Sequence, residues 1–121
     1  MKDTIDFSQI WSMAYEAGTE AGNAAQCTPM IITEEIGPNP GQQWIVPDGP
    51  CGFAEIKFAG NTQWGRWAKK ERGCTKAYPK GLHYWVGEFG QSYTRKSAFA
   101  IAFAKVLNNY GIDCYTSSRL D

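Results

Sequence analysis

Apolar side chains recur every three or four positions near the start of the chain, which is the spacing of one helix face. The pattern runs from about residue 7 to residue 25. Asp6 is a good N-cap for this helix, and Gln9 completes a capping box three residues later. Small residues four apart form a smooth stripe that we expect to receive another backbone closely: Ala14, Gly18 and Gly22.

A second long helix is predicted near the end of the chain. It begins at Ser92 or Thr94, and Gly111 ends it, because glycine is favoured just past a helix C-terminus. Its apolar face follows the i, i+3, i+4 rule at Phe99, Ala102, Phe103, Val106, Leu107 and Tyr110. A short third helix, "QWGRWAKKER", is predicted between an Asn61 or Thr62 cap and Gly73.

Shorter segments with β-forming residues predict strands, each bounded by Gly, Pro, Asn or Asp. They are "MIITEE", "QWIV", "CGFAEIKFA", "GLHYWVGEF" and "IDCYTS", followed by a charged tail, "SRLD". The turn "PDGP" joins the second strand to the third. In the third strand the alternation directs one set of side chains to the core: Ala54, Ile56 and Phe58. The other face carries Phe53, Glu55 and Lys57.

These elements predict an α+β fold in one domain over residues 1–121. Their order is α-β-β-β-α-β-α-β, and we expect a two-layer domain. In it a mostly antiparallel sheet of about five strands is packed by three helices.

The charge is distributed unevenly although the net charge is zero. Residues 1–55 hold eight acids and one base, a net of −7, and residues 56–121 hold eleven bases and four acids, a net of +7. Such asymmetry points to an anionic partner or to a homo-oligomer in which the acidic half of one copy meets the basic half of another. The alternative is that the two halves neutralise each other within one chain.

No stretch is apolar enough to span a membrane, and the first residues lack the apolar core of a secretory signal. We therefore expect no membrane partner and a location in the compartment of synthesis.

Residues 61–85 concentrate cations and aromatic rings. Cations neutralise phosphates and flat rings stack on bases, so this segment is the candidate ligand-binding site. The residues expected to contact the ligand are Arg66, Lys69, Lys70, Arg72, Lys76, Tyr78, Lys80, Tyr84 and Trp85. The alternative interpretation places Trp64 and Trp67 in the core and makes the cations an ordinary solvated helix face.

Other chemistry has less support. Asp48, Glu55 and Lys57 resemble the pattern of a metal-dependent nuclease, but such a short pattern recurs by chance. The four cysteines have no CxxC spacing, and a zinc site or a catalytic thiol with His83 would require distant segments to meet. Phosphate-binding glycine loops and the GxSxG and HExxH motifs are absent. We expect no cofactor, metal or catalytic residue.

The chain resembles a group of small uncharacterised proteins of tailed bacteriophages. The resemblance rests on "VPDGPCGFA", on Gln91-Ser92 with Arg95-Lys96 before the last helix, and on Gly111-Ile112 ahead of the terminal "SRLD". It implies a viral protein expressed inside a bacterium, in the host cytoplasm or the virion, and supplies no activity.

The sequence therefore predicts a non-enzymatic phage accessory protein that binds nucleic acid or a signalling nucleotide. The alternative is an interaction protein that blocks a host factor or packs in the virion, with a nuclease as the third interpretation.

Overall fold

The computed structural model describes residues 6–27, 30–33, 40–41, 43–46 and 49–120. Helix α1 (Phe7–Ala24) begins as predicted. The backbone N–H of Gln9 donates to Asp6 Oδ1 at 2.8 Å, and the backbone N–H of Asp6 donates to Gln9 Oε1 at 3.2 Å. The capping box is thereby confirmed.

The other two helices also begin at predicted N-caps, although the C-cap of the last helix is Tyr110 rather than Gly111. In α2 (Gln63–Arg72) the Thr62 hydroxyl accepts the Gly65 N–H at 2.9 Å, and Gly73 ends the helix in the left-handed region at φ 66°. In α3 (Tyr93–Asn109) the N-cap is Ser92, whose hydroxyl accepts the Arg95 N–H at 3.3 Å. Both helices therefore begin where a side-chain oxygen satisfies a free backbone donor.

A four-stranded antiparallel sheet forms the second layer, in the order β4-β5-β3-β6. Strand β3 (Gly52–Phe58) pairs with β5 (Leu82–Trp85) on one edge and with β6 (Tyr115–Leu120) on the other. The short β4 (Thr75–Lys76) lies outside β5 and was not predicted. The α+β class is confirmed, with one strand fewer in the sheet than the expected five or so.

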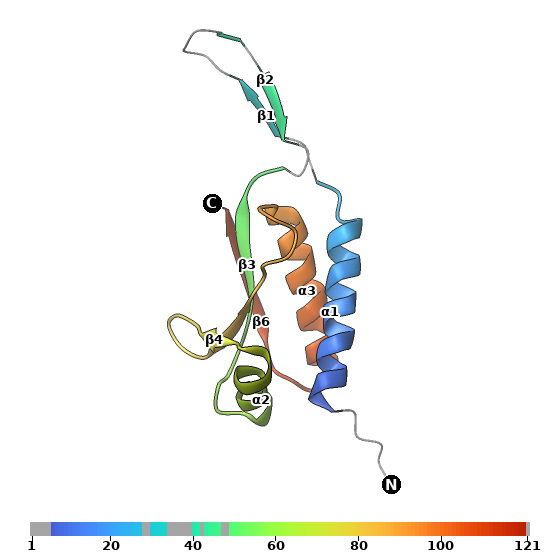
Figure 1. Cartoon of the computed structure of the whole chain (residues 1–121), viewed down its shortest axis with the longest axis vertical. Helices are drawn as coiled ribbons and strands as arrows, with labels where there is room; N and C mark the ends of the chain where they lie inside the picture. Colours follow the sequence, from blue (N-terminus) through green and yellow to red (C-terminus); the bar gives the residue numbers. More distant parts are fainter. Residues whose placement is uncertain (1–5, 28–29, 34–39, 42, 47–48, 121) are drawn as a thin grey trace.

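The pairing of the first strands differs from the prediction. Strand β1 (Met30–Thr33) pairs antiparallel with β2 (Gln43–Val46) as a separate two-stranded unit. This hairpin extends away from the helix and sheet layers (Figure 1). Strand β2 does not pair with β3, because β5 and β6 occupy both edges of β3. The predicted "PDGP" turn between them lies partly outside the described residues.

The last strand was also misplaced. It begins at Tyr115 rather than Ile112 and includes three residues that were assigned to a tail, through Leu120. Leu120 pairs with Gly52 and Arg119 pairs with Phe53, so the free edge of β3 supplies the backbone partners for this polar segment.

Helices α1 and α3 lie side by side and cover one face of the sheet (Figure 1). The core between the layers includes Ile56, Phe99, Phe103 and Leu107, and Trp64 of α2 joins it at one end. At Gly18 an added Cβ would lie 3.0 Å from the Phe99 carbonyl oxygen, which confirms the close approach expected of the small-residue stripe. None of the helices in the described ranges has the length and hydropathy of a membrane span.

Candidate functional site

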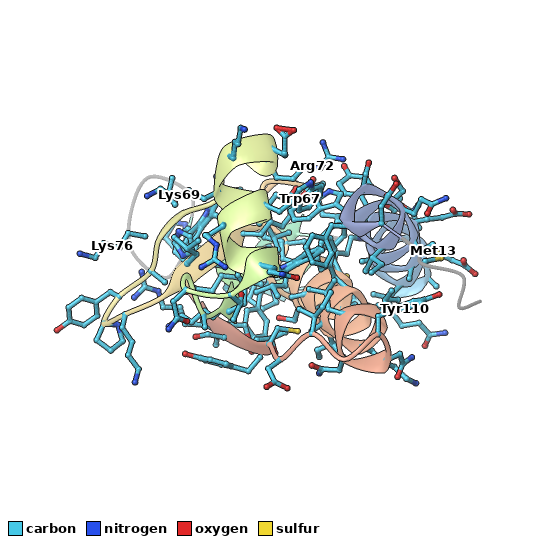
Figure 2. The ribbon with its side chains drawn as sticks, turned by 90° about the horizontal axis from the view of Figure 1, so that it is seen from below. Met13, Trp67, Lys69, Arg72, Lys76 and Tyr110 are labelled. Carbon is cyan, nitrogen blue, oxygen red and sulfur yellow. The ribbon has the colours of Figure 1, made fainter. Side chains whose placement is uncertain are left out.

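Four lysines from separate segments surround one hollow of about 750 Å³. Lys57 comes from β3, Lys69 from α2, Lys76 from β4 and Lys80 from the loop between β4 and β5. We call this site the lysine hollow. Figure 2 shows Lys69 and Lys76 on the same side of α2, whereas Arg72 and Trp67 lie on the side of α1.

The lysine hollow is strongly electropositive. Its remaining lining residues in the described structure carry no carboxylate: Phe58, Ala59, Gly60, Asn61, Gly81, Leu82 and Tyr115. The ion-pair geometry of the described residues joins none of the four ammonium groups to an acid. Lys57 Nζ donates to the Tyr78 carbonyl at 3.0 Å and lies 5.9 Å from the Tyr115 ring centroid. Like charges gathered without counterions attract a polyanion.

The structure divides the predicted cations instead of placing them on one face. Arg66 adjoins the lysine hollow, because its guanidinium donates to the carbonyl of the lining residue Asn61 at 3.0 Å. Lys70 is exposed on α2 and does not line the hollow.

Arg72 points elsewhere and has a packing role. Its guanidinium lies over two indole rings, 5.6 Å from the Trp11 centroid and 5.2 Å from the Trp67 centroid. It also donates to the Ser8 hydroxyl at 3.4 Å. These contacts hold α2 against α1, so Arg72 connects the two helices and is separated from the lysines that it was expected to join.

The predicted rings are divided in the same way. Tyr78 is 88% exposed and Trp85 is 42% exposed, so both can meet a ligand. Tyr84 faces the core instead. Its ring stacks on Phe103 with centroids 5.7 Å apart, its hydroxyl donates to Glu88 at 2.7 Å, and burial raises its pKa above the ordinary value.

Trp64 and Trp67 pack with the aromatic core, Trp64 fully buried within it, as the alternative interpretation held. Tyr115 was missed, although it is 57% exposed and lines the lysine hollow. Tyr115 lay within the predicted last strand, and the missing information was the pairing of that strand with β3, which places Tyr115 opposite Lys57.

The sheet has a second face that the helices do not cover. Strand register places alternate residues there: Phe53, Glu55 and Lys57 of β3, His83 and Trp85 of β5, and Tyr115, Ser117 and Arg119 of β6. We call this surface the open sheet face. At its centre His83 Nδ1 lies 2.7 Å from Glu55 Oε1, and Nε2 lies 3.1 Å from the Thr75 hydroxyl.

The residues of the nuclease interpretation are engaged with other groups. Glu55 contacts His83, Lys57 bonds the Tyr78 carbonyl, and Asp48 lies outside the described residues. In the described part of the chain no group of three His, Cys, Asp or Glu side chains could hold a metal ion.

All four cysteines are free thiols. Burial raises the pKa of Cys74 and of Cys114 to about 11, which keeps both protonated near neutral pH. Among the described residues, the His83 ring contacts Glu55 and Thr75, and no thiol bonds to it.

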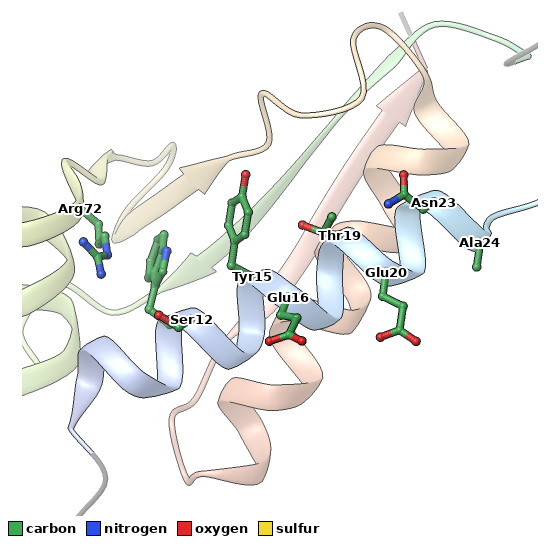
Figure 3. Close-up of a pocket in the computed structure, with 9 residues that line it drawn as sticks. Ser12, Tyr15, Glu16, Thr19, Glu20, Asn23, Ala24 and Arg72 are labelled. Carbon is green, nitrogen blue, oxygen red and sulfur yellow. The ribbon is translucent and has the colours of Figure 1, made fainter.

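A third surface runs along α1 and has the opposite charge. A groove of about 1000 Å³ is lined by Trp11, Ser12, Tyr15, Glu16, Thr19, Glu20, Asn23, Ala24 and Arg72 (Figure 3). We call it the α1 groove. It is larger than the lysine hollow, but the carboxylates of Glu16 and Glu20 disfavour an anionic ligand. In Figure 3 these two carboxylates point to one side of α1, while Tyr15 and Thr19 point to the other.

Comparison with protein-family models, with curated proteins and with solved structures finds no match for this chain.

Proposed function

We propose that the protein binds a phosphate-bearing ligand, a nucleic acid or a signalling nucleotide, at the lysine hollow. The observation that carries the proposal is the convergence of four lysines from four segments on one concavity whose described lining contains no carboxylate. Bringing like charges together opposes folding unless a counter-charge is present, so such a site is suited to an anion.

The geometry suits phosphates better than it suits a single carboxylate. Lysine ammonium groups act as point charges with several free donors, and they tolerate the varied positions of phosphate oxygens along a chain. Arg66 beside the hollow extends the positive surface, and its exposed guanidinium is available to a second phosphate.

The phage resemblance gives the proposal its setting. A small protein expressed inside an infected bacterium meets both nucleic acid and signalling nucleotides. We therefore propose a non-enzymatic accessory role in the host cytoplasm or in the particle.

Charge-matched variants test this function. One double variant, Lys69→Gln with Lys76→Gln, removes two charges from the hollow; the control, Lys70→Gln with Lys105→Gln, removes two exposed charges outside it. Fluorescence polarisation measures binding of a labelled single strand, a labelled duplex and a labelled cyclic dinucleotide at about 50 and 200 mM salt.

We expect at least one probe to bind in a salt-dependent way. The hollow variant weakens that binding on the order of tenfold and lowers the salt slope, whereas the control changes it much less. The function is rejected if no probe binds at low salt, or if both double variants weaken binding equally.

The α1 groove favours a second candidate function, interaction with a protein partner. Its exposed Tyr15 and its carboxylates Glu16 and Glu20 complement a partner that presents cationic side chains beside an apolar contact. A second copy of this chain qualifies, because its lysine hollow has the required charge. Sedimentation at low and high salt tests self-association, and Glu16→Gln with Glu20→Gln should abolish any salt-sensitive dimer. If the protein is monomeric at both salt concentrations, self-association through the α1 groove is rejected.

A further inference from the structure

We propose that the ligand of the lysine hollow is a single-stranded nucleic acid whose bases stack on the open sheet face. This inference rests on the proposed function and assigns its ligand class. It starts from the continuity of the two surfaces, since Lys57 and Tyr115 belong to both. Phosphates in the hollow would therefore place the attached nucleosides beside the face.

The open sheet face has the shape that flat bases require. A concavity of about 340 Å³ over it is lined by strand residues and by Tyr78, and no described helix contributes to that lining. Because alternate side chains of one face stand roughly perpendicular to the sheet, rings of β5 and β6 project from the same face on either side of β3.

Three exposed rings border this surface: Trp85 of β5, Tyr115 of β6 and Tyr78 of the β4–β5 loop. Trp85 pairs with Glu55 and Tyr115 pairs with Lys57, so their two rings stand two strands and two residues apart. Strand spacing puts that separation at about 12 Å, too far for one base and suited to two bases of one strand.

Phe53 has a supporting position. Its ring lies 5.4 Å from the Trp85 ring, and the cationic groups of Arg119 and Lys96 lie 5.5 and 5.8 Å from its centroid. Because these contacts occupy Phe53, we assign it to holding Trp85 and Arg119 in place rather than to stacking.

The charge of the face is compatible with a phosphate chain. Glu55 is the one carboxylate among the described residues that line it, and it lies 2.7 Å from the His83 ring. Lys57 and Arg119 stand on either side of that pair along β3 and β6. A single nucleic-acid strand can therefore cross the open sheet face with a cation at each end of its path.

A duplex does not fit the same surface. Its bases are stacked on each other and show only their edges, whereas a ring platform requires unstacked bases with free faces. Recognition by stacking tolerates many sequences, so we expect weak sequence preference and strong salt dependence.

The test compares ring variants on matched probes. Fluorescence polarisation measures binding of labelled oligothymidylate and oligouridylate single strands and of a duplex of equal length, at one salt concentration. Trp85→Leu and Tyr115→Leu remove rings from the face, Trp85→Phe keeps one, and Tyr110→Leu removes an exposed ring elsewhere as the control. Thermal melts verify that each variant is folded.

We expect single strands to bind more tightly than the duplex. Trp85→Leu and Tyr115→Leu each weaken single-strand binding by about 5- to 150-fold, the range measured for loss of one stacked base. Trp85→Phe retains most of the affinity, and Tyr110→Leu leaves it unchanged.

The proposal is overturned if folded Trp85→Leu and Tyr115→Leu bind single strands as the parent does, or if the duplex binds as tightly as the single strand. The double variant Lys69→Gln with Lys76→Gln then shows whether the phosphate-binding function survives, because it would still bind every polyanion more weakly than the parent. If neither the ring variants nor this double variant weakens binding, both proposals are rejected.

Discussion

At the residue scale, Gly65 shows how closely the segments around the site approach each other. A Cβ added there would lie 2.2 Å from the Ala59 carbonyl oxygen and 2.9 Å from the Gly60 Cα. Both atoms belong to the backbone and cannot rotate away. The residue also donates its N–H to the Thr62 cap, so the first turn of α2 is fixed against the end of β3.

We expect Gly65→Ala to destabilise the protein although alanine is the better helix former. Its helix propensity gains about 1 kcal/mol, but the backbone must shift, and overpacking of this kind costs about 1–3 kcal/mol or more. Urea unfolding measures the change. Gly87→Ala is the control, because nothing lies within 4 Å of a Cβ at Gly87. A Gly65→Ala protein as stable as the parent would contradict the packing.

The buried thiols give a second prediction at this scale. Burial raises the pKa of Cys74 and Cys114 from 9.0 to about 11, so at pH 8 each has about 100-fold less thiolate than at the ordinary pKa. We expect exposed Cys51 to be alkylated first by iodoacetamide at pH 8. Cys74 and Cys114 should react at least 100-fold more slowly than in urea, and a higher pH should accelerate them. Equal rates in the folded and unfolded chain would show that these thiols are accessible and ionised.

At the scale of elements, one cation supplements the aromatic contact between α1 and α2, in which Phe7 and Trp11 pack on the indoles of α2. Arg72 covers the rings of Trp11 and Trp67 and bonds Ser8, which joins the basic half of the chain to the acidic half through packing rather than through a carboxylate. Replacing a stacked arginine removes packing area as well as charge from the protein.

Arg72→Gln is therefore expected to lower the free energy of unfolding by about 1–2 kcal/mol. Its effect on single-strand binding should not exceed that of Lys105→Gln, which removes one exposed charge from α3. Urea titration and polarisation measure the two quantities. If Arg72→Gln instead reduces binding as strongly as Lys69→Gln does, Arg72 contacts the ligand.

Patterns within a short stretch of sequence were enough to predict the helices and the core-facing side of β3. Caps and helical spacing located all three helices, and alternation gave the correct core face of β3. Strand pairing was not predictable in the same way, because β2 could have paired with β1 or β3 by its own pattern. Strand β6 is polar on both faces and is an edge strand of the sheet. Its sequence therefore has little apolar periodicity from which a strand could be predicted.

The candidate site was predicted in part for the same reason. Spacing along α2 identified its cations, but the separation of Lys69 from Arg72 depends on where α1 packs. The sequence analysis placed Lys57 on the outer face of the third strand and in the nuclease pattern, and it placed Tyr115 only within the last predicted strand. Neither residue was assigned to the ligand-binding site. Both belong to strands whose register, absent from the sequence pattern, brings them to the hollow.

At the scale of the whole molecule, the main positive and negative surfaces of the described residues stay apart. Among the described residues, the side-chain ion pair joins Glu55 of the acidic half to its sheet neighbour His83 in the basic half. The lysine hollow and the carboxylates of the α1 groove belong to different surfaces. A molecule polarised in this way presents its positive side to an approaching polyanion, and the resulting attraction weakens as salt screens it.

The most direct test of this account locates the ligand on the surface. We would titrate isotope-labelled protein with an oligothymidylate single strand and follow amide chemical shifts. The account predicts the largest changes at Lys57, Lys69, Lys76 and Tyr115, with Glu16 and Glu20 of α1 unchanged. Changes centred on the α1 groove, or none at low salt, would contradict the assignment of the lysine hollow as a phosphate-binding site.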